Sequence, residues 1–320
     1  MSGSVRGMLL RPVAVALVLV LAAGCTSSRQ IAQRTATTAG TAGPAGASTA
    51  PSATPSPVPP PTLPRGGRTL FPGFRVVAYY GGAGTPALGV LGEGSPDAAA
   101  RRLLAAARPF GTPTRPVLPA FELIATVAQA SAGDDGNYSL ATPPGEVDRY
   151  LTAVRKIKGL LVLDIQPGRS DFLRQVRRYE RLLRQPDVGL ALDPEWHMGP
   201  TQVPGKVIGS ATAAEINAVS AYLAGIVARY RLPQKLFVIH QFTNDMVVDK
   251  AKVLSRPGLA VTFHIDGFGS RTAKRSKYDV LHVRPPFFNG FKLFYDEDID
   301  RFSPKEALAL RPAPDLFSYQ

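Results

Sequence analysis

The stretch Val188-Gly189-Leu190-Ala191-Leu192-Asp193-Pro194-Glu195-Trp196 says most about the fold of this 320-residue chain. In an extended strand, successive side chains point to opposite faces. One face then carries Val188, Leu190 and Leu192, and the other carries Gly189, Ala191, Asp193, Glu195 and His197. Small residues followed by acids are typical of the inner face of a barrel strand, because the carboxyl ends of such strands open at a functional site.

On both sides of this stretch, short apolar runs alternate with amphipathic segments, a pattern that indicates a parallel α/β fold. Strands are expected at residues 75–80, 117–126, 159–165, 188–193, 236–241, 259–265, 279–283 and 291–295. Helices are expected at residues 96–107, 145–157, 171–184, 213–230, 245–254 and 304–310. About eight strands in about 250 residues predict a TIM-type (β/α)8 barrel, irregular in its last units. A doubly wound open sheet is the alternative.

The N-terminus has the parts of an export signal: basic residues, an apolar run over residues 13–23, and small residues before a cysteine. The segment Leu21-Ala22-Ala23-Gly24-Cys25 resembles the bacterial lipobox, in which the signal is removed before a cysteine that receives acyl chains such as palmitate. This resemblance implies a signal peptide over residues 1–24 and a lipoprotein anchored to the extracytoplasmic side of the cell membrane through Cys25. An ordinary secretory signal followed by a chance cysteine is the alternative.

Residues 25–68 are rich in Ala, Thr, Ser, Gly and Pro and have no periodic apolar face. A segment of this composition cannot bury a core, so we expect a disordered linker that carries the lipid anchor. The barrel domain is expected over residues 69–320. With 45% hydrophobic residues, the chain has enough apolar side chains for one substantial core.

Polar residues gather where the other strands are expected to end. They are Glu122, Asp164, Gln166, His240, Gln241, His264 and Asp266. Because the carboxyl ends of barrel strands meet at one face, these side chains are expected to line a common site. Two points stay open: Glu122 either faces the barrel mouth or pairs with a neighbouring Arg, and either His240 or Gln241 is the inward residue of its strand.

Several carboxyl groups at a barrel mouth fit glycoside hydrolysis, in which one acid protonates the leaving oxygen and a second charge assists. Charge repulsion between neighbouring acids would raise one pKa, so we expect Glu195 to be the protonated acid and Asp193 its ionised partner. Flat aromatic rings bind sugar faces, and Tyr79, Tyr80 and Trp196 are the candidates for that contact.

The segment Leu192-Asp193-Pro194-Glu195-Trp196 resembles the Asp-x-Glu signature of barrel glycosidases such as the chitinase-like and muramidase families. This resemblance implies that Glu195 is the acid and Asp193 its helper. The acids that the chitinase pattern has earlier in this strand are replaced by Val188 and Ala191. With its lipobox, Pro-rich linker and Tyr79-Tyr80-Gly81-Gly82 strand end, the whole chain resembles actinobacterial lipoproteins that have a glycoside-hydrolase-like TIM barrel.

A metal hydrolase could use His197, His240, His264 and Asp266, but no paired-His motif supports it, and we expect no metal or cofactor. A barrel that binds sugar or scaffolds envelope proteins without turnover is the main alternative to an enzyme.

The chain carries a formal net charge of +13, with basic clusters over residues 174–184 and 271–277. An exported protein is not expected to meet nucleic acid, so the expected partners are a carbohydrate or cell-wall polymer and anionic lipid head groups. A solvated basic helix face is the alternative reading of these clusters.

Overall fold

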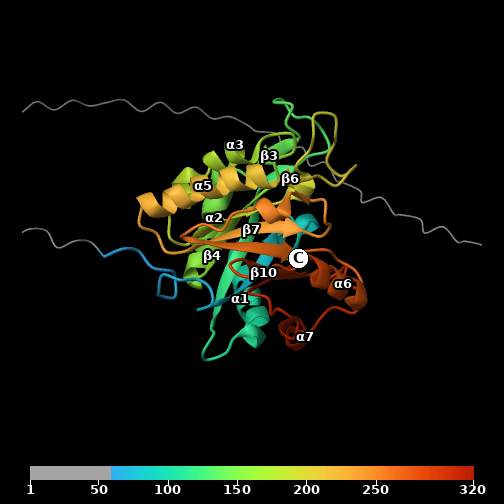
Figure 1. Cartoon of the computed structure of the whole chain (residues 1–320). Coiled ribbons are helices and arrows are strands. Elements are labelled where there is room, and N and C mark those ends of the chain that lie inside the picture. The colour runs from blue at the N-terminus through green and yellow to red at the C-terminus, as the bar shows by residue number, and fades with distance from the viewer. Residues whose placement is uncertain (1–58) are drawn as a thin grey trace, which may run out of the picture. The chain divides into compact units, whose positions relative to one another are not determined.

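Eight parallel strands close into a barrel in chain order (Figure 1). They are β1 (Arg75–Gly81), β2 (Val117–Ala128), β4 (Leu160–Ile165), β5 (Val188–Leu192), β7 (Lys235–Gln241), β9 (Leu259–Ile265), β10 (Phe288–Leu293) and β11 (Leu316–Tyr319). The barrel is closed because β1 pairs with both β2 and β11. This computed structural model describes residues 59–320, and it confirms the TIM-type α/β fold over the open sheet.

The helices that connect the strands begin at capping residues visible in the sequence. They are α1 (Pro96–Ala107), α2 (Pro144–Lys156), α3 (Phe172–Arg177), α4 (Glu180–Leu183), α5 (Ala213–Arg229), α6 (Arg271–Leu281) and α7 (Pro304–Leu308). Ser95 caps α1, and Thr212 forms a reciprocal capping box with Glu215 at the start of α5. Residues 245–254, expected as a helix, instead form β8 (Val247–Val248), which pairs with β6 (Ala211–Thr212), and a short 3₁₀ turn, η5 (Lys250–Lys252).

Strand alternation separates two apolar layers. Inside the barrel, one layer includes Val76, Ala78, Leu118, Ala120, Leu160, Val162, Ala191, Leu236, Val238 and Ala260. The outer layer, beneath the helices, includes Val188, Leu190 and Leu192. The predicted two faces are therefore confirmed for residues 188–192. Phe71 and Phe288, with ring centroids 4.9 Å apart, belong to the inner layer.

The last part of the barrel differs from the prediction. Residues 279–283, expected as a strand, belong to the end of α6 and the turn after it, because Lys274, Tyr278 and Leu281 recur at helical spacing and are all buried. The eighth strand is β11, which the sequence analysis missed. The helix expected over residues 171–184 is broken into α3 and α4 around Tyr179.

The folded unit begins earlier than the expected boundary at residue 69. Leu63 is buried in the inner apolar layer, and the Arg65 guanidinium donates to the backbone oxygens of Val117 and Ile157. Residues 59–68 therefore pack against the barrel rather than belonging to the linker. The expected signal peptide, Cys25 and the rest of the linker lie outside the described residues. Within residues 59–320, no helix combines the length and the apolar character needed to cross a membrane.

Candidate active site

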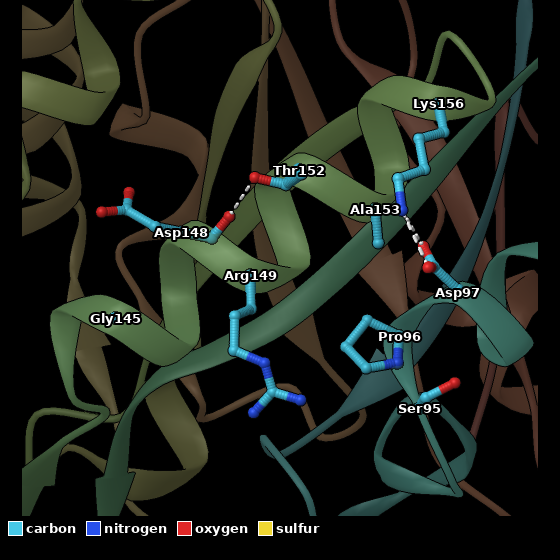
Figure 2. A pocket seen from close by; sticks show the side chains of 9 residues that line it. All are labelled: Ser95, Pro96, Asp97, Gly145, Asp148, Arg149, Thr152, Ala153 and Lys156. Atoms are coloured by element: carbon cyan, nitrogen blue, oxygen red, sulfur yellow. Dashed lines mark hydrogen bonds and ion pairs between the residues drawn. The ribbon is translucent and has the colours of Figure 1, made fainter.

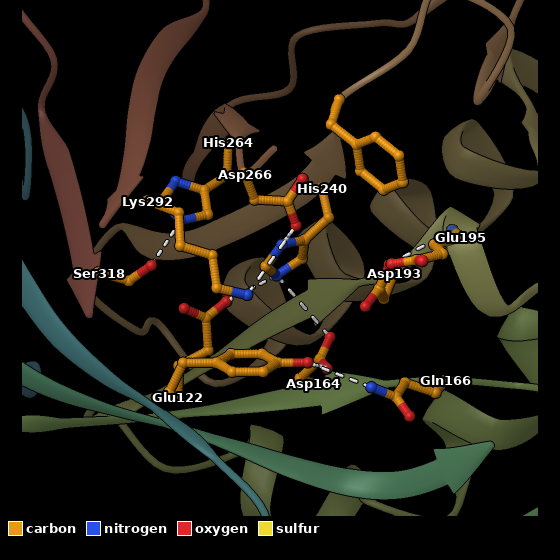
Figure 3. Close-up of polar contacts among 12 residues, drawn as sticks. Glu122, Asp164, Gln166, Asp193, Glu195, His240, His264, Asp266, Lys292 and Ser318 are labelled. Atoms are coloured by element: carbon orange, nitrogen blue, oxygen red, sulfur yellow. Dashed lines mark hydrogen bonds and ion pairs between the residues drawn. The ribbon is translucent and has the colours of Figure 1, made fainter. Parts of the chain in front are cut away.

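The inner side chains at the carboxyl ends of the strands form one polar layer, which we call the mouth layer (Figure 3). Its members are Tyr80, Glu122, Asp164, Asp193, His240, His264, Asp266, Lys292 and Ser318, and all are buried. Apart from Asp266, which follows His264, each follows by the two-residue repeat a small or apolar inner residue of its own strand. The layer lies where the active sites of TIM-barrel enzymes are found.

His240 lies between two carboxylates. Its Nδ1 is 2.7 Å from Oδ2 of Asp266, and its Nε2 is 2.9 Å from Oε1 of Glu122. Burial alone would lower the pKa of His240, but the charges of Glu122 and Asp266 raise it well above its usual value. The ring is therefore an imidazolium that donates a hydrogen bond to each acid. Glu122 faces the mouth and pairs with this histidine, not with an Arg.

The two acids that flank His240 are ionised. Burial would raise the pKa of Asp266, but His240 and then Lys292 lower it to about 2. The pKa of Glu122 is likewise lowered, because the charge and hydrogen bond of His240 outweigh burial. The mouth layer thus contains two carboxylates that carry a charge over the whole physiological pH range.

Tyr80 connects β1 to β4. Its hydroxyl donates to Oδ2 of Asp164 at 3.1 Å and accepts from Nε2 of Gln166 at 3.1 Å. The amide oxygen of Gln166 in turn accepts from the backbone N–H of Ala128 at 3.0 Å, which fixes the orientation of the amide. Burial raises the pKa of Asp164 to about 7, and the charge of Glu122 acts in the same direction. Asp164 is therefore largely neutral below that pH.

The sequence pattern predicted Glu195 on an extended strand, but the structure places it beyond the end of β5. The chain leaves β5 at Asp193 and turns into the 3₁₀ helix η4 (Pro194–Trp196), which proline favours at its first position. Oδ1 of Asp193 accepts a hydrogen bond from the backbone N–H of Glu195 at 3.3 Å. Asp193 and Glu195 are thus neighbours through a capping contact, and Glu195 is only half-buried.

The protonation of this pair differs from the expectation. Burial raises the pKa of Glu195 to about 7, with the charge of Asp266 adding to the effect. Burial also raises the pKa of Asp193 well above its usual value, and neighbouring acids contribute. The expectation of an ionised Asp193 was wrong because this carboxyl is enclosed by the barrel. The ionised carboxylate that acts on Glu195 is Asp266.

His264 is neutral. Burial lowers its pKa to about 3, and its Nε2 lies 2.7 Å from Oγ of Ser318. The ring lies directly over Gly290 of β10, where a Cβ atom would be 2.1 Å from Nδ1 of His264. Glycine is therefore required on β10 to leave room for this side chain.

Lys292 supplies the second cation of the mouth layer. Its Nζ lies 4.0 Å from Oδ2 of Asp266 and 3.5 Å from the centroid of the Tyr80 ring. Its side chain is only 4% exposed. With Lys292 and His240 positive and Glu122 and Asp266 negative, the fixed charges of the layer balance.

Four of the expected site residues lie apart from this cluster. Tyr79 faces outward and packs against Tyr319, with ring centroids 6.2 Å apart, because it alternates with Tyr80. Gln241 likewise faces outward, which settles His240 as the inward residue of β7. His197 binds the backbone oxygen of Ser210 at 2.7 Å outside the barrel. Trp196 is half-buried in η4, next to Glu195.

Lys292 and Ser318 were not predicted from the sequence. Lys292 lies in the strand expected over residues 291–295, where no site residue was assigned, and β11 was not predicted. The signal that could have found Lys292 is a charged residue two positions after Gly290, on the small-residue face of its strand. Within the described part of the chain, no three His, Cys, Asp or Glu side chains are arranged to hold a metal ion.

A groove of about 400 Å³ lies outside the barrel, between α1 and α2 (Figure 2). The ammonium group of Lys156 on its wall is paired with Asp97 at 2.8 Å, and both side chains are about half exposed. The groove contains none of the buried titratable groups described above. The mouth layer is therefore the candidate active site.

Comparisons with known proteins add little to this picture. No protein-family model matches the chain, and no curated protein matches it. Among solved structures, it is similar to oxaloacetate acetylhydrolase in complex with the inhibitor 3,3-difluorooxalacetate, with a TM-score of 0.41 and 12% identity over 77% of this chain and 74% of that one. A likeness of this strength carries no argument about activity.

Proposed function

We propose that this protein is a glycoside hydrolase-like enzyme that cleaves a cell-envelope or environmental glycan, with Glu195 as the general acid. One observation carries the proposal: Glu195 is a half-buried carboxyl group with a pKa of about 7, beside carboxylates that remain ionised. Pairs of acids whose pKa values are pushed apart by their environments are what acid-base hydrolysis of a glycosidic bond requires.

The roles follow from the protonation states. Glu195 gives its proton to the leaving glycosidic oxygen as the bond to the anomeric carbon breaks. The negative charge of Asp266 stabilises the positive charge that develops on the sugar ring. Asp193 remains neutral and holds the backbone of Glu195 through its 3.3 Å hydrogen bond. Water adds to the anomeric carbon and loses a proton to Glu195, which restores the acid.

Unused acceptor atoms support a ligand rich in hydroxyl groups. Within residues 59–320, Oε2 of Glu122, Oδ1 of Asp164 and Oδ1 of Asp266 are buried and accept no hydrogen bond. Buried acceptors without a donor are costly, and sugar hydroxyls would supply donors to them. Tyr80 in the mouth layer and Trp196 beside Glu195 would provide ring faces for the sugar.

The proposed location comes from the sequence. Cys25, outside the described residues, would carry the lipid anchor on the extracytoplasmic side of the membrane, and the linker would carry the barrel toward its glycan.

A sugar-binding or scaffold lipoprotein without turnover is the second candidate. One observation favours it: Asp164, His240 and His264 are fully buried and each is hydrogen-bonded to a neighbouring side chain, so much of the mouth layer is committed to internal pairs. Such pairs stabilise a preformed site whether or not it reacts.

The two candidates are separated by a panel of envelope polysaccharides and aryl glycosides, tested with the full chain carrying Cys25→Ser so that no lipid is attached. Release of reducing ends from one member would support the enzyme. Saturable binding of one or more members, with no reducing ends released from any of them, would support the non-catalytic protein.

The pH dependence of turnover is predicted from Glu195. A general acid works only while it carries its proton, so turnover should be constant below about pH 7 and fall about tenfold per pH unit above it. Asp266 has a pKa of about 2, so it is ionised at every pH above about 3. Its protonation should therefore not lower the turnover rate in that pH range. The initial rate on a responsive substrate between pH 4 and pH 9 checks this. A rate that rises as the pH passes 7 would contradict the assignment of Glu195 as the acid.

A further inference from the structure

Six exposed arginines lie together on the outer surface formed by α3, α4 and α5, which we call the arginine face. They are Arg174, Arg177, Arg178, Arg181, Arg184 and Arg229. The helices are neighbours, since Arg177 of α3 lies over the ring of Tyr222 of α5, with 5.6 Å between the guanidinium carbon and the ring centroid.

Acids offset only part of this charge. Arg181 pairs with Asp148 at 3.1 Å, and Arg184 pairs with Glu180. Among the described residues, the remaining four arginines of the face have no carboxylate partner. The face therefore keeps a positive excess, and its arginines have donors free for planar anions such as phosphate or carboxylate.

Several of these arginines are held in place by aromatic rings. The guanidinium carbon of Arg184 lies 5.0 Å from the ring centroid of Tyr230, and that of Arg229 lies 5.6 Å from the same centroid. Long side chains that are already ordered lose less conformational entropy when they bind. The face is thus better prepared to bind an anion than freely moving surface arginines are.

A groove of about 130 Å³ runs beside the face, between the start of α2 and α3–α4, and Arg178 and Arg181 contribute to its wall. Its apolar lining comes from Pro144, Val147 and Leu182. The groove gives the face a concave edge along which a chain could lie, with the arginines on one side.

The face lacks the features of a membrane-binding surface. Among residues 59–320, the exposed large apolar side chains lie on other elements, and none belongs to α3, α4 or α5. Proteins that rest on a bilayer usually insert such side chains between the lipid head groups. A flexible polymer needs no apolar anchor, because its charges alone can contact the arginines.

We propose that the arginine face binds a linear polyanionic polymer, one whose repeats carry phosphate or carboxylate groups. This binding is separate from the mouth layer and does not depend on whether the barrel has hydrolase activity. It would hold the barrel against an acidic polymer while the mouth remains free.

The test measures binding of fluorescently labelled linear inorganic polyphosphate to the full chain carrying Cys25→Ser, over a range of NaCl concentrations. The test variant is Arg174→Gln/Arg177→Gln/Arg178→Gln, whose arginines have no carboxylate partner in the described part of the chain. The matched control is Arg101→Gln/Arg108→Gln/Arg284→Gln, which removes the same charge from exposed positions elsewhere. Vesicles that contain phosphatidylglycerol are the second ligand.

The face variant is expected to bind polyphosphate at least about tenfold more weakly, with a slope of log affinity against log salt smaller by about 2, whereas the control keeps most of the affinity. Equal losses in both variants would show that net charge alone drives binding and would overturn the proposal. So would unchanged binding by the face variant. Vesicle binding that is tighter than polyphosphate binding and is lost in the face variant would assign the face to a membrane and overturn the polymer.

Discussion

Replacing Glu195 with Gln is expected to lower glycan turnover by about 10²- to 10⁴-fold, the usual contribution of a general acid. Gln keeps the size and the polar character of the side chain but cannot give a proton to the leaving oxygen. The hydrogen bond to Asp193 comes from the backbone N–H of Glu195, so the variant should keep this residue in position. The Kd for the glycan should therefore change little. The measurement is kcat and Kd for the same glycan with both forms of the protein.

The matched control for this result is Glu93→Gln. The Glu93 side chain is 52% exposed and lies 3.7 Å from Arg102 on the surface, so its removal should leave turnover unchanged. An aryl glycoside with a good leaving group needs little acid assistance, so it should be affected less by Glu195→Gln than a natural glycan. Full activity of the Glu195→Gln variant on a natural glycan would contradict the proposed role.

Replacing His240 with Leu is expected to lower the free energy of unfolding by about 3–5 kcal/mol. The variant leaves the carboxylates of Glu122 and Asp266 buried without the cation that each contacts within 3 Å. Buried charges without a partner are among the largest single causes of destabilisation. Urea unfolding followed by circular dichroism gives the value.

The control for this prediction is His282→Leu. His282 lies half-buried at the end of α6 and forms no ion pair among residues 59–320, so its replacement should cost less than about 1 kcal/mol. In the variant His240→Leu/Glu122→Gln/Asp266→Asn, the two charges are removed together with their partner. That variant should recover part of the lost stability. Similar stabilities of His240→Leu and the natural protein would show that the two acids are not ionised.

The two-residue repeat of the strands was sufficient to predict part of the mouth layer. It placed Asp164, His264 and Asp266 correctly, because an inward side chain is decided within its own strand. The same rule failed at Glu195, since Pro194 ends the strand and starts a 3₁₀ turn. It also could not choose between His240 and Gln241, whose strand carries large apolar residues on both faces.

Contacts between strands could not be predicted from the sequence. The ionisation of Asp193 depends on how completely other strands enclose it, and the partners of His240 come from β2 and from the end of β9, 118 and 26 residues away. Residues 279–283 were misread because a short apolar run fits a strand as well as a helix end. With residues 279–283 taken as one strand and 291–295 as the next, β11 was not predicted, and Ser318 was missed with it.

The most direct test of the account is the pKa of Glu195 itself, measured by NMR titration of protein labelled with ¹³C at the glutamate carboxyl groups. The Glu195→Gln variant identifies the signal by its loss. The account predicts a midpoint of about 7 for this signal. A midpoint near the ordinary glutamate value of about 4.3 would mean that Glu195 is ionised at neutral pH and would contradict its role as the acid.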